Sequence, residues 1–254
     1  MTPPPLIQLR GVKKAFGDVR VLEGVDLDVN AGETFVLLGG SGSGKTVLMK
    51  HLEGLLQPDE GTVVVDGHDL SHGDPHALEA VRREVGVQFQ SGALFDSLSV
   101  RDNVAFPLRE LQHLKASEVA ARVDELLSLV GLSEVAAQLP GELSGGMRKR
   151  LAFARAMVMR PKVFLADEPT AGLDPLTTQT VDDAIVTAHK KLGVTAFIIT
   201  HDLPTAFRIA DRVGLLHEGR IIEAAPPEVF RASKHPAVRA FLKDWLEREA
   251  SARA

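Results

Sequence analysis

The segment that most constrains this sequence is a glycine-rich octet at residues 39–46, which has the pattern G-x-x-x-x-G-K-T. This pattern is typical of loops that bind the phosphates of a nucleotide. An apolar run at residues 34–38 predicts a buried strand before it, and residues 47–52, which lack Gly and Pro, predict a helix after it. A strand, a glycine-rich loop and a helix in this order are the context that the motif requires.

The residue types of this octet indicate its chemistry. Glycines allow a tight turn that points main-chain N–H groups at an anion, and the positive end of the following helix dipole adds to the attraction. Lys45 is expected to reach the β- and γ-phosphates, and the Thr46 hydroxyl to hold Mg²⁺. A glycine-rich turn that binds nothing is the alternative. The predicted nucleotide-binding residues are Gly39, Gly40, Ser41, Gly42, Ser43, Gly44, Lys45 and Thr46.

Two acids, Asp167 and Glu168, directly follow an apolar run at residues 163–166 that predicts a strand. Ligands bind at the carboxyl ends of parallel strands, so both carboxylates are expected beside the nucleotide. Asp167 can hold Mg²⁺ through water or together with Thr46, because this ion prefers oxygen ligands. Glu168 can polarise an attacking water. An acid pair with a purely structural role is the alternative.

A second glycine-containing segment, residues 143–147, precedes a predicted helix that is rich in Arg and Lys. Ser144, Gly145 and Gly146 would present a hydroxyl and open main-chain N–H groups at the helix start, which makes a second anion-binding end. One nucleotide needs only one phosphate loop, so this second element suggests a nucleotide shared between two chains. Ser-Gly-Gly is also a common helix cap, so the segment alone leaves both interpretations open.

The order of predicted elements indicates the fold class. Two runs, at residues 6–13 and 19–29, predict an antiparallel pair of strands, and strands and helices then alternate, which predicts a largely parallel sheet covered on both faces. We therefore predict an α/β nucleotide-binding core that is interrupted by a helical insertion. The predicted division is an ATPase domain at 1–230, with its core at 1–90 and 160–230 and the helical subdomain at 91–159, and a C-terminal helical tail at 231–254.

The last predicted helix is amphipathic. Its apolar stripe comprises Val238, Phe241, Leu242, Trp245 and Leu246 at helical spacing. This stripe either packs on its own domain or docks on a second copy or a partner.

Composition narrows the function classes. The net charge of −5 does not favour binding to nucleic acid, and the absence of cysteine excludes disulfides and thiolate chemistry. No apolar run approaches the roughly 20 residues that span a bilayer, and residues 1–5 lack the basic and apolar regions of a signal peptide. We therefore expect a cytoplasmic protein whose membrane role, if any, comes through a partner.

Taken together, the motifs resemble the ATPase subunit of ABC transporters across about residues 6–230. They are the octet at 39–46, Gln90, residues 143–147, residues 163–168, the Gly172-Leu173-Asp174 segment and His201. In that family two subunits meet head to tail, and the signature segment of one closes over ATP and Mg²⁺ held by the other. The resemblance implies an α/β fold with a P-loop NTPase (RecA-like) core, an antiparallel β subdomain and an inserted α-helical signature subdomain. It also implies a homodimer that works with an integral membrane permease.

The resemblance also implies roles for single residues. Phe16 is similar to the aromatic that stacks on adenine, and Gln90 to the residue that contacts Mg²⁺ and the attacking water and senses the permease. Asp174 is similar to the residue that crosses the dimer interface, and His201 to the switch histidine that contacts the γ-phosphate. The catalytic set implied is therefore Glu168, His201, Gln90 and Lys45, with Thr46, Gln90 and Asp167 at the metal.

A narrower resemblance points to cargo. Residues 89–100 and 103–109, the Gly-Gly-Met-Arg-Lys-Arg run at 145–150 and residues 235–242 are similar to the ATPase of MCE-type phospholipid transporters, the Mla systems. This implies phospholipid transport across a bacterial envelope, an MCE-domain lipid-binding partner and a place on the cytoplasmic face of the inner membrane. Phe106, Pro107 and Leu108 would receive a segment of the permease, or else belong to the core.

Three alternatives stay open from the sequence. The first keeps the ATPase and changes the cargo to a small solute such as an amino acid. The second is an ABC protein of translation or DNA repair, which the single ATPase unit and the lack of long coiled-coil insertions disfavour. The third is a P-loop kinase or GTPase, which residues 143–147 and His201 disfavour.

Overall fold

The computed structural model describes residues 4–112 and 114–253. The strands are β1 (Ile7–Phe16), β2 (Val19–Val29), β3 (Thr34–Leu38), β4 (Glu60–Val65), β5 (His68–Asp69), β6 (Val85–Gln88), β7 (Val163–Asp167), β8 (Thr195–Ile199), β9 (Arg212–His217) and β10 (Arg220–Ala225). The α-helices are α1 (Lys45–Leu52), α2 (Pro75–Glu84), α3 (Val100–Leu111), α4 (Ala116–Leu129), α5 (Gly145–Met157), α6 (Pro175–Leu192), α7 (Leu203–Ile209), α8 (Pro227–Arg231) and α9 (Pro236–Arg253).

The core of the fold is a six-stranded sheet with the order β10-β9-β3-β8-β7-β6. All neighbouring strands in it are parallel except β10, which pairs antiparallel with β9. Successive side chains of β3 serve opposite faces: Val36 and Leu38 belong to one hydrophobic cluster, and Phe35 and Leu37 to the other. Burial on both faces explains why the parallel strands are continuous apolar runs in the sequence. The predicted α/β fold class is confirmed.

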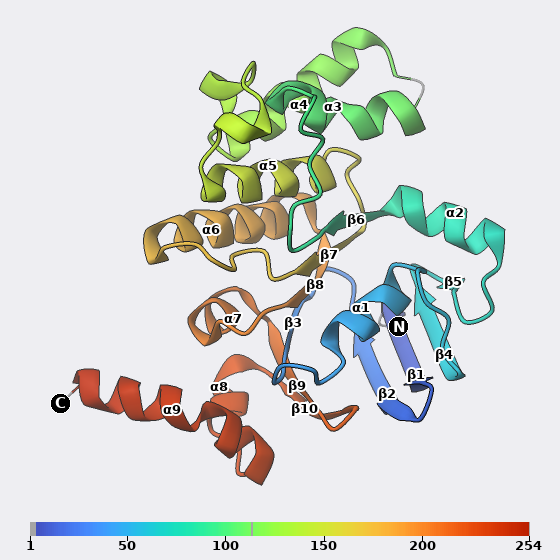
Figure 1. The fold of residues 1–254 in the computed structure, drawn as a ribbon, viewed down its shortest axis with the longest axis vertical. Helices are drawn as coiled ribbons and strands as arrows, with labels where there is room; N and C mark the ends of the chain where they lie inside the picture. Colours follow the sequence, from blue (N-terminus) through green and yellow to red (C-terminus); the bar gives the residue numbers. More distant parts are fainter. Residues whose placement is uncertain (1–3, 113, 254) are drawn as a thin grey trace.

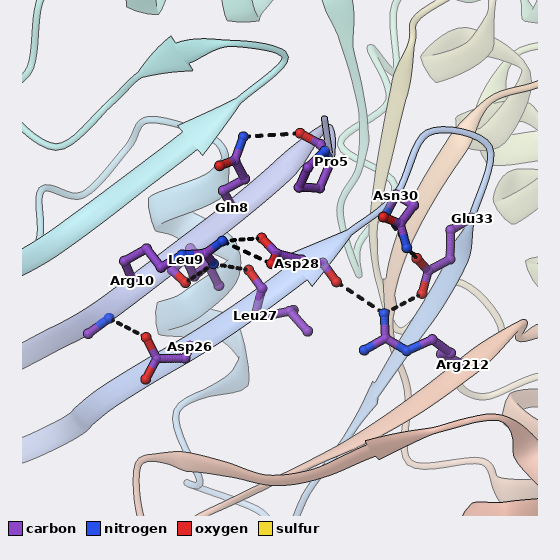
Figure 2. Close-up of polar contacts among 11 residues, drawn as sticks. Pro5, Gln8, Leu9, Arg10, Asp26, Leu27, Asp28, Asn30, Glu33 and Arg212 are labelled. Atoms are coloured by element: carbon purple, nitrogen blue, oxygen red, sulfur yellow. Dashed lines mark hydrogen bonds and ion pairs between the residues drawn. The ribbon is translucent and has the colours of Figure 1, made fainter. Parts of the chain in front are cut away.

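A four-stranded antiparallel sheet with the order β2-β1-β4-β5 packs beside α1 and α2. Arg212 of β9 ties the antiparallel sheet to the core sheet (Figure 2). It donates to the Asp28 carbonyl near the end of β2 at 3.1 Å and to the carboxylate of Glu33, just before β3, at 2.9 Å. Within the antiparallel sheet, the Nη2 group of Arg10 donates to both Asp28 carboxylate oxygens, at 2.7 and 2.9 Å. These contacts fix the antiparallel sheet against the strand that leads into residues 39–46.

Helices α3 and α4 gather at one end of the molecule, and α8 and α9 lie at the other (Figure 1). Helices α3, α4 and α5 lie within the stretch at residues 91–159 that the sequence predicts to be helical, and Gly131, with a φ of 65°, follows the end of α4. A buried amide organises the approach to α3: Asn103 donates to the carbonyls of Phe95, Leu98 and Ser99 and accepts from the Phe95 N–H. The side chains of α3, α4 and α5 share one hydrophobic cluster with a face of the core sheet.

The C-terminal part adds two elements that the sequence did not predict, β10 and α8. The predicted stripe on α9 packs on its own chain: Val238 and Leu242 are fully buried, and the Trp245 ring lies 4.9 Å from that of Phe207 on α7. The Leu246 side chain lies outside the described part. Across the helices of residues 4–112 and 114–253, none has both the length and the apolar character that a bilayer crossing needs.

Candidate nucleotide site

Residues 39–46, hereafter the phosphate loop, connect the end of β3 to the start of α1. Gly42 and Gly44 have positive φ values of 74° and 102°, and no side chain caps α1. The Lys45 ammonium folds back over the loop and donates to the carbonyls of Gly39 and Gly40, both at 2.9 Å. Burial lowers the pKa of Lys45, although the negative charges of Glu168 and Asp167 act to raise it.

The loop has the properties of an anion cradle. The Ser43 hydroxyl is buried and has no hydrogen-bond partner among the described residues. A Cβ on Gly39 would lie 2.6 Å from that hydroxyl and 2.7 Å from the Leu216 carbonyl, so only glycine fits there. An uncapped helix start, an unpartnered hydroxyl and a neighbouring ammonium offer donors of the kind that bind phosphate oxygens. The residues present therefore fit a triphosphate.

The residues predicted at the metal meet at the edge of this loop. Thr46 donates its hydroxyl hydrogen to the Asp167 carboxylate at 3.2 Å. Burial raises the pKa of Asp167, while the Thr46 hydrogen bond opposes the rise. A hydroxyl and a carboxylate are hard oxygen ligands, so the pair fits Mg²⁺ with water and phosphate oxygens as its other ligands.

Glu168 follows β7 in a strained conformation, with a φ of 51°. Its carboxylate is only 12% exposed and is 2.8 Å from the His201 Nδ1, which comes from the end of β8. Thr200 donates to the second carboxylate oxygen at 3.2 Å. Left-handed backbone is costly for a non-glycine residue and persists where surrounding contacts hold it, as the bond from the Glu168 N–H to the Ile199 carbonyl does here. Thr200 is a residue that the sequence analysis missed, although it directly precedes His201.

Gln90 lies two residues beyond β6, which is the neighbour of β7 in the sheet. Its side chain is exposed, and no hydrogen bond from it is recorded in the described residues. Its carbonyl instead accepts from the Lys149 ammonium of α5 at 2.5 Å. The structure thus brings the loop of Gln90 to the site without placing its amide on Asp167 or Glu168.

Phe16 ends β1 with its ring 48% exposed. The Lys14 ammonium lies 5.7 Å from the ring centre. An exposed aromatic face beside a cation is available for stacking, which is consistent with the predicted adenine contact and does not test it.

Ser144 and Asp174 cap two adjacent helices. The Ser144 side chain accepts from the Met147 N–H at the start of α5, and the Asp174 side chain accepts from the Leu176 and Thr177 N–H groups at the start of α6. The helix starts touch, because a Cβ on Gly146 would lie 2.0 Å from the Thr177 methyl group. Within the described residues no hydrogen bond links residues 143–147 to the phosphate loop.

This fold and these groups define a class of protein, the P-loop nucleoside triphosphatases, in which a glycine-rich loop after one parallel strand faces two acids at the end of another strand of the same sheet. Comparison with known proteins refines the class. Residues 22–171 match the family described as ABC transporter. The chain belongs to this family, as an ATP-binding and ATP-hydrolysing subunit.

Named relatives and solved structures agree with this membership. The chain is 44% identical to a probable ribonucleotide transport ATP-binding protein mkl of Mycobacterium leprae over 236 residues, covering 93% of this chain and 68% of that protein. It is 40% identical to the methionine import ATP-binding protein MetN of Halalkalibacterium halodurans over 249 residues, covering 96% and 73%.

Two solved structures share the fold at 30% identity. The dimeric ATP-binding cassette MJ0796, in a post-hydrolysis state bound to ADP and Pi, aligns with a TM-score of 0.79 over 87% of this chain and 98% of that one. The protein cbiO1 from Clostridium perfringens, part of the ABC transporter complex cbiONQ, aligns with a TM-score of 0.84 over 99% of both chains.

Proposed function

We propose that this chain powers phospholipid transport across a bacterial envelope as the ATPase of an MCE-type system. The ATP-hydrolysis part of this proposal rests on one observation: Lys45, Asp167 and Glu168 lie close together at one edge of the core sheet. The cargo half rests on the resemblance of residues 89–100, 103–109, 145–150 and 235–242 to the Mla ATPases. In this proposal the chain sits on the cytoplasmic face of the inner membrane, bound to an integral permease and an MCE-domain protein.

In the proposed reaction water attacks the γ-phosphorus, the bond to the bridging oxygen breaks, and ADP and phosphate leave. Glu168 accepts the proton of that water, with His201 and Thr200 holding its carboxylate in place. Lys45 lies where it can stabilise charge on the transferring phosphoryl group. Mg²⁺ held at Thr46 and Asp167 would neutralise charge on the phosphate oxygens when bound.

The second half of the proposed site comes from another copy of the chain. Residues 143–147 and Asp174 stand at the adjoining starts of α5 and α6, without a hydrogen bond to their own phosphate loop in the described residues. A head-to-tail homodimer would bring Ser144, Gly145 and Gly146 of one copy over ATP bound to the other, with Phe16 on the adenine. The dimeric structure of MJ0796 supports this arrangement.

A groove of about 270 Å³ between α2, β6 and α3 is the proposed permease contact. Its walls include Phe89, Pro107 and Leu111, and the Phe89 and Leu111 side chains are exposed. The sequence suggested that Phe106, Pro107 and Leu108 contact the permease or belong to the core. Pro107 lines this groove, whereas Leu108 is fully buried in the core. The groove also holds Glu53, whose pKa burial raises to about 7.

Purification of the tagged chain from membranes tests the proposal. We expect an integral permease and an MCE-domain protein to come with it. A Leu111→Asp variant should lose the permease, while Val229→Asp, which adds the same charge at an exposed position on α8, should keep it. Association with ribosomes or DNA in place of a permease would contradict the proposal.

Small-solute import is the second candidate function. The relatives named for methionine import and ribonucleotide transport favour it, since they match at 40% and 44% identity. Recovery of a permease with a solute-binding protein, and without an MCE-domain protein, would select this function over lipid transport.

A further inference from the structure

Lys149 joins the two loops that carry the proposed catalytic groups Gln90 and Glu168. It lies on α5, just beyond residues 143–147. Its ammonium donates to the Gln90 carbonyl at 2.5 Å and to the Glu168 carbonyl at 3.2 Å. The two acceptors follow β6 and β7, which are neighbouring parallel strands. One side chain therefore spans the gap between two strand ends at the catalytic edge.

The surroundings make these bonds strong. The Lys149 side chain is half-buried, and desolvation lowers its pKa, while the charges of Glu168 and Asp167 oppose this. Hydrogen bonds from a charged donor are about twice as strong as neutral ones. Their loss would leave the Gln90 carbonyl without this donor and the Glu168 carbonyl with only its bond from the Ala171 N–H. The main chain of Lys149 is also bonded to β6, because the buried side-chain amide of Gln88 donates to the Lys149 carbonyl at 3.3 Å.

Both loops are held in unusual backbone conformations. Glu168 has a φ of 51°, and Gly92 and Ala93, beyond Gln90, have φ values of 79° and 45°. Left-handed backbone is costly at the non-glycine residues Glu168 and Ala93, so outside contacts are needed to hold these two residues in it. Arg155, two turns further along α5, donates to the Gly92 and Ala93 carbonyls at 2.9 and 2.7 Å, but has no recorded bond to Glu168. Of these two cations of α5, Lys149 is the one bonded to the catalytic strand end.

We propose that Lys149 is a positioning residue that couples the loop of Gln90 to the placement of the Glu168 carboxylate. This rests on the proposed function, in which Glu168 activates water. The loop continues from Phe89, which lines the groove assigned to the permease, so movement there reaches Glu168 through the Lys149 ammonium. Loss of the ammonium leaves Glu168 chemically intact and less well placed.

The test compares Lys149→Met with Arg150→Met, Arg155→Met and Lys149→Gln. Arg150 is a matched control, because it lies on the same helix and donates to the Val130 and Gly131 carbonyls, away from both catalytic loops. For Lys149→Met we expect ATP affinity to stay within about two-fold of wild type while kcat falls by about ten-fold or more. Lys149→Gln, which keeps one donor, should recover part of kcat, and Arg150→Met should leave kcat unchanged.

Hydrogen exchange gives a readout that does not depend on turnover. Lys149→Met should accelerate exchange in residues 90–93 and also in residues 168–171, whereas Arg155→Met should do so only in the first segment. An unchanged kcat and unchanged exchange at 168–171 in Lys149→Met, with wild-type protein active, would overturn the coupling role. Absence of ATPase activity in the wild-type protein, assembled with its permease, would instead count against the proposed function.

Discussion

Two helices in the described part of the chain, α1 and α5, start at glycine-rich segments, and of the two α1 alone has free donors for an anion within its own chain. At α1 the cap is Gly44, no side chain closes the helix, and the Ser43 hydroxyl lacks a partner in the described residues. At α5 the cap is Ser144, whose hydroxyl already accepts from the Met147 N–H. Similar sequence patterns thus give a helix start with free donors and one whose cap is satisfied within its own chain.

The cations near the two helix starts differ in the same way. Lys45 lies over the phosphate loop, held by carbonyls of the loop itself. Arg148 and Lys149 of α5 are turned to carbonyls of their own chain, at Leu143 and at Gln90 and Glu168. The comparison teaches that a helix start becomes a phosphate site when its donors and cations face a common space. In the proposed function residues 143–147 instead present a surface to a second copy.

Lys45→Ala should produce the largest effect, because it removes the cation at the start of α1. We expect ATP affinity to fall by about 100-fold or more and turnover to disappear. Titration with a fluorescent ATP analogue measures the affinity, and Lys50→Ala, an exposed position on the same helix, is the control. If Lys45→Ala kept the ATP affinity of wild type, the claim that the start of α1 is the phosphate site of the single chain would be contradicted.

Glu168→Gln should separate binding from chemistry. Turnover should fall by about 10²–10⁴-fold, since the amide cannot accept the water proton, while ATP affinity stays near that of wild type. Because ATP is then bound and not consumed, a dimer should accumulate with ATP and Mg²⁺ and be visible by sedimentation velocity. A normal ATPase rate in this variant would refute the role of Glu168.

The variants Ser144→Ala and Ser43→Ala should have the smallest effects, and these effects should differ in kind between the two helix starts. Ser144→Ala removes a helix cap and should cost about 1 kcal/mol of unfolding free energy, with no change in ATP affinity of the single chain. Ser43→Ala removes a hydroxyl without a recorded partner, so it should cost little stability and weaken ATP binding. Urea denaturation without nucleotide, followed by ATP titration, measures both quantities. Equal stability losses in the two variants would contradict the comparison.

The sequence predicts the phosphate loop and the parallel strands well, because each is specified locally. Residues 34–38 and 163–166 are apolar runs long enough for a buried strand, and the glycines of the loop permit the positive φ values that its turn needs. β10 escapes prediction because it is an edge strand that includes Glu223, Ala224 and Ala225, which are weak signals for pairing.

The site is less predictable where contacts cross between distant segments. The bonds from Thr200 and His201 to Glu168, and from Lys149 to two loops, depend on the order of β6, β7 and β8 in the sheet. The left-handed backbone of Glu168 likewise has no signature in its residue type. The domain divisions at residues 91, 160 and 231 stay predictions.

The most direct test of the central claim, that two copies share each ATP, is a mixing experiment. Ser144→Arg should bind ATP as a single chain and fail to hydrolyse it, and Lys45→Ala should be inactive alone. A heterodimer of the two variants contains one intact composite site, so an equal mixture should recover about a quarter of the wild-type ATPase rate. No recovery, with heterodimers demonstrated by differential tags, would contradict the shared site.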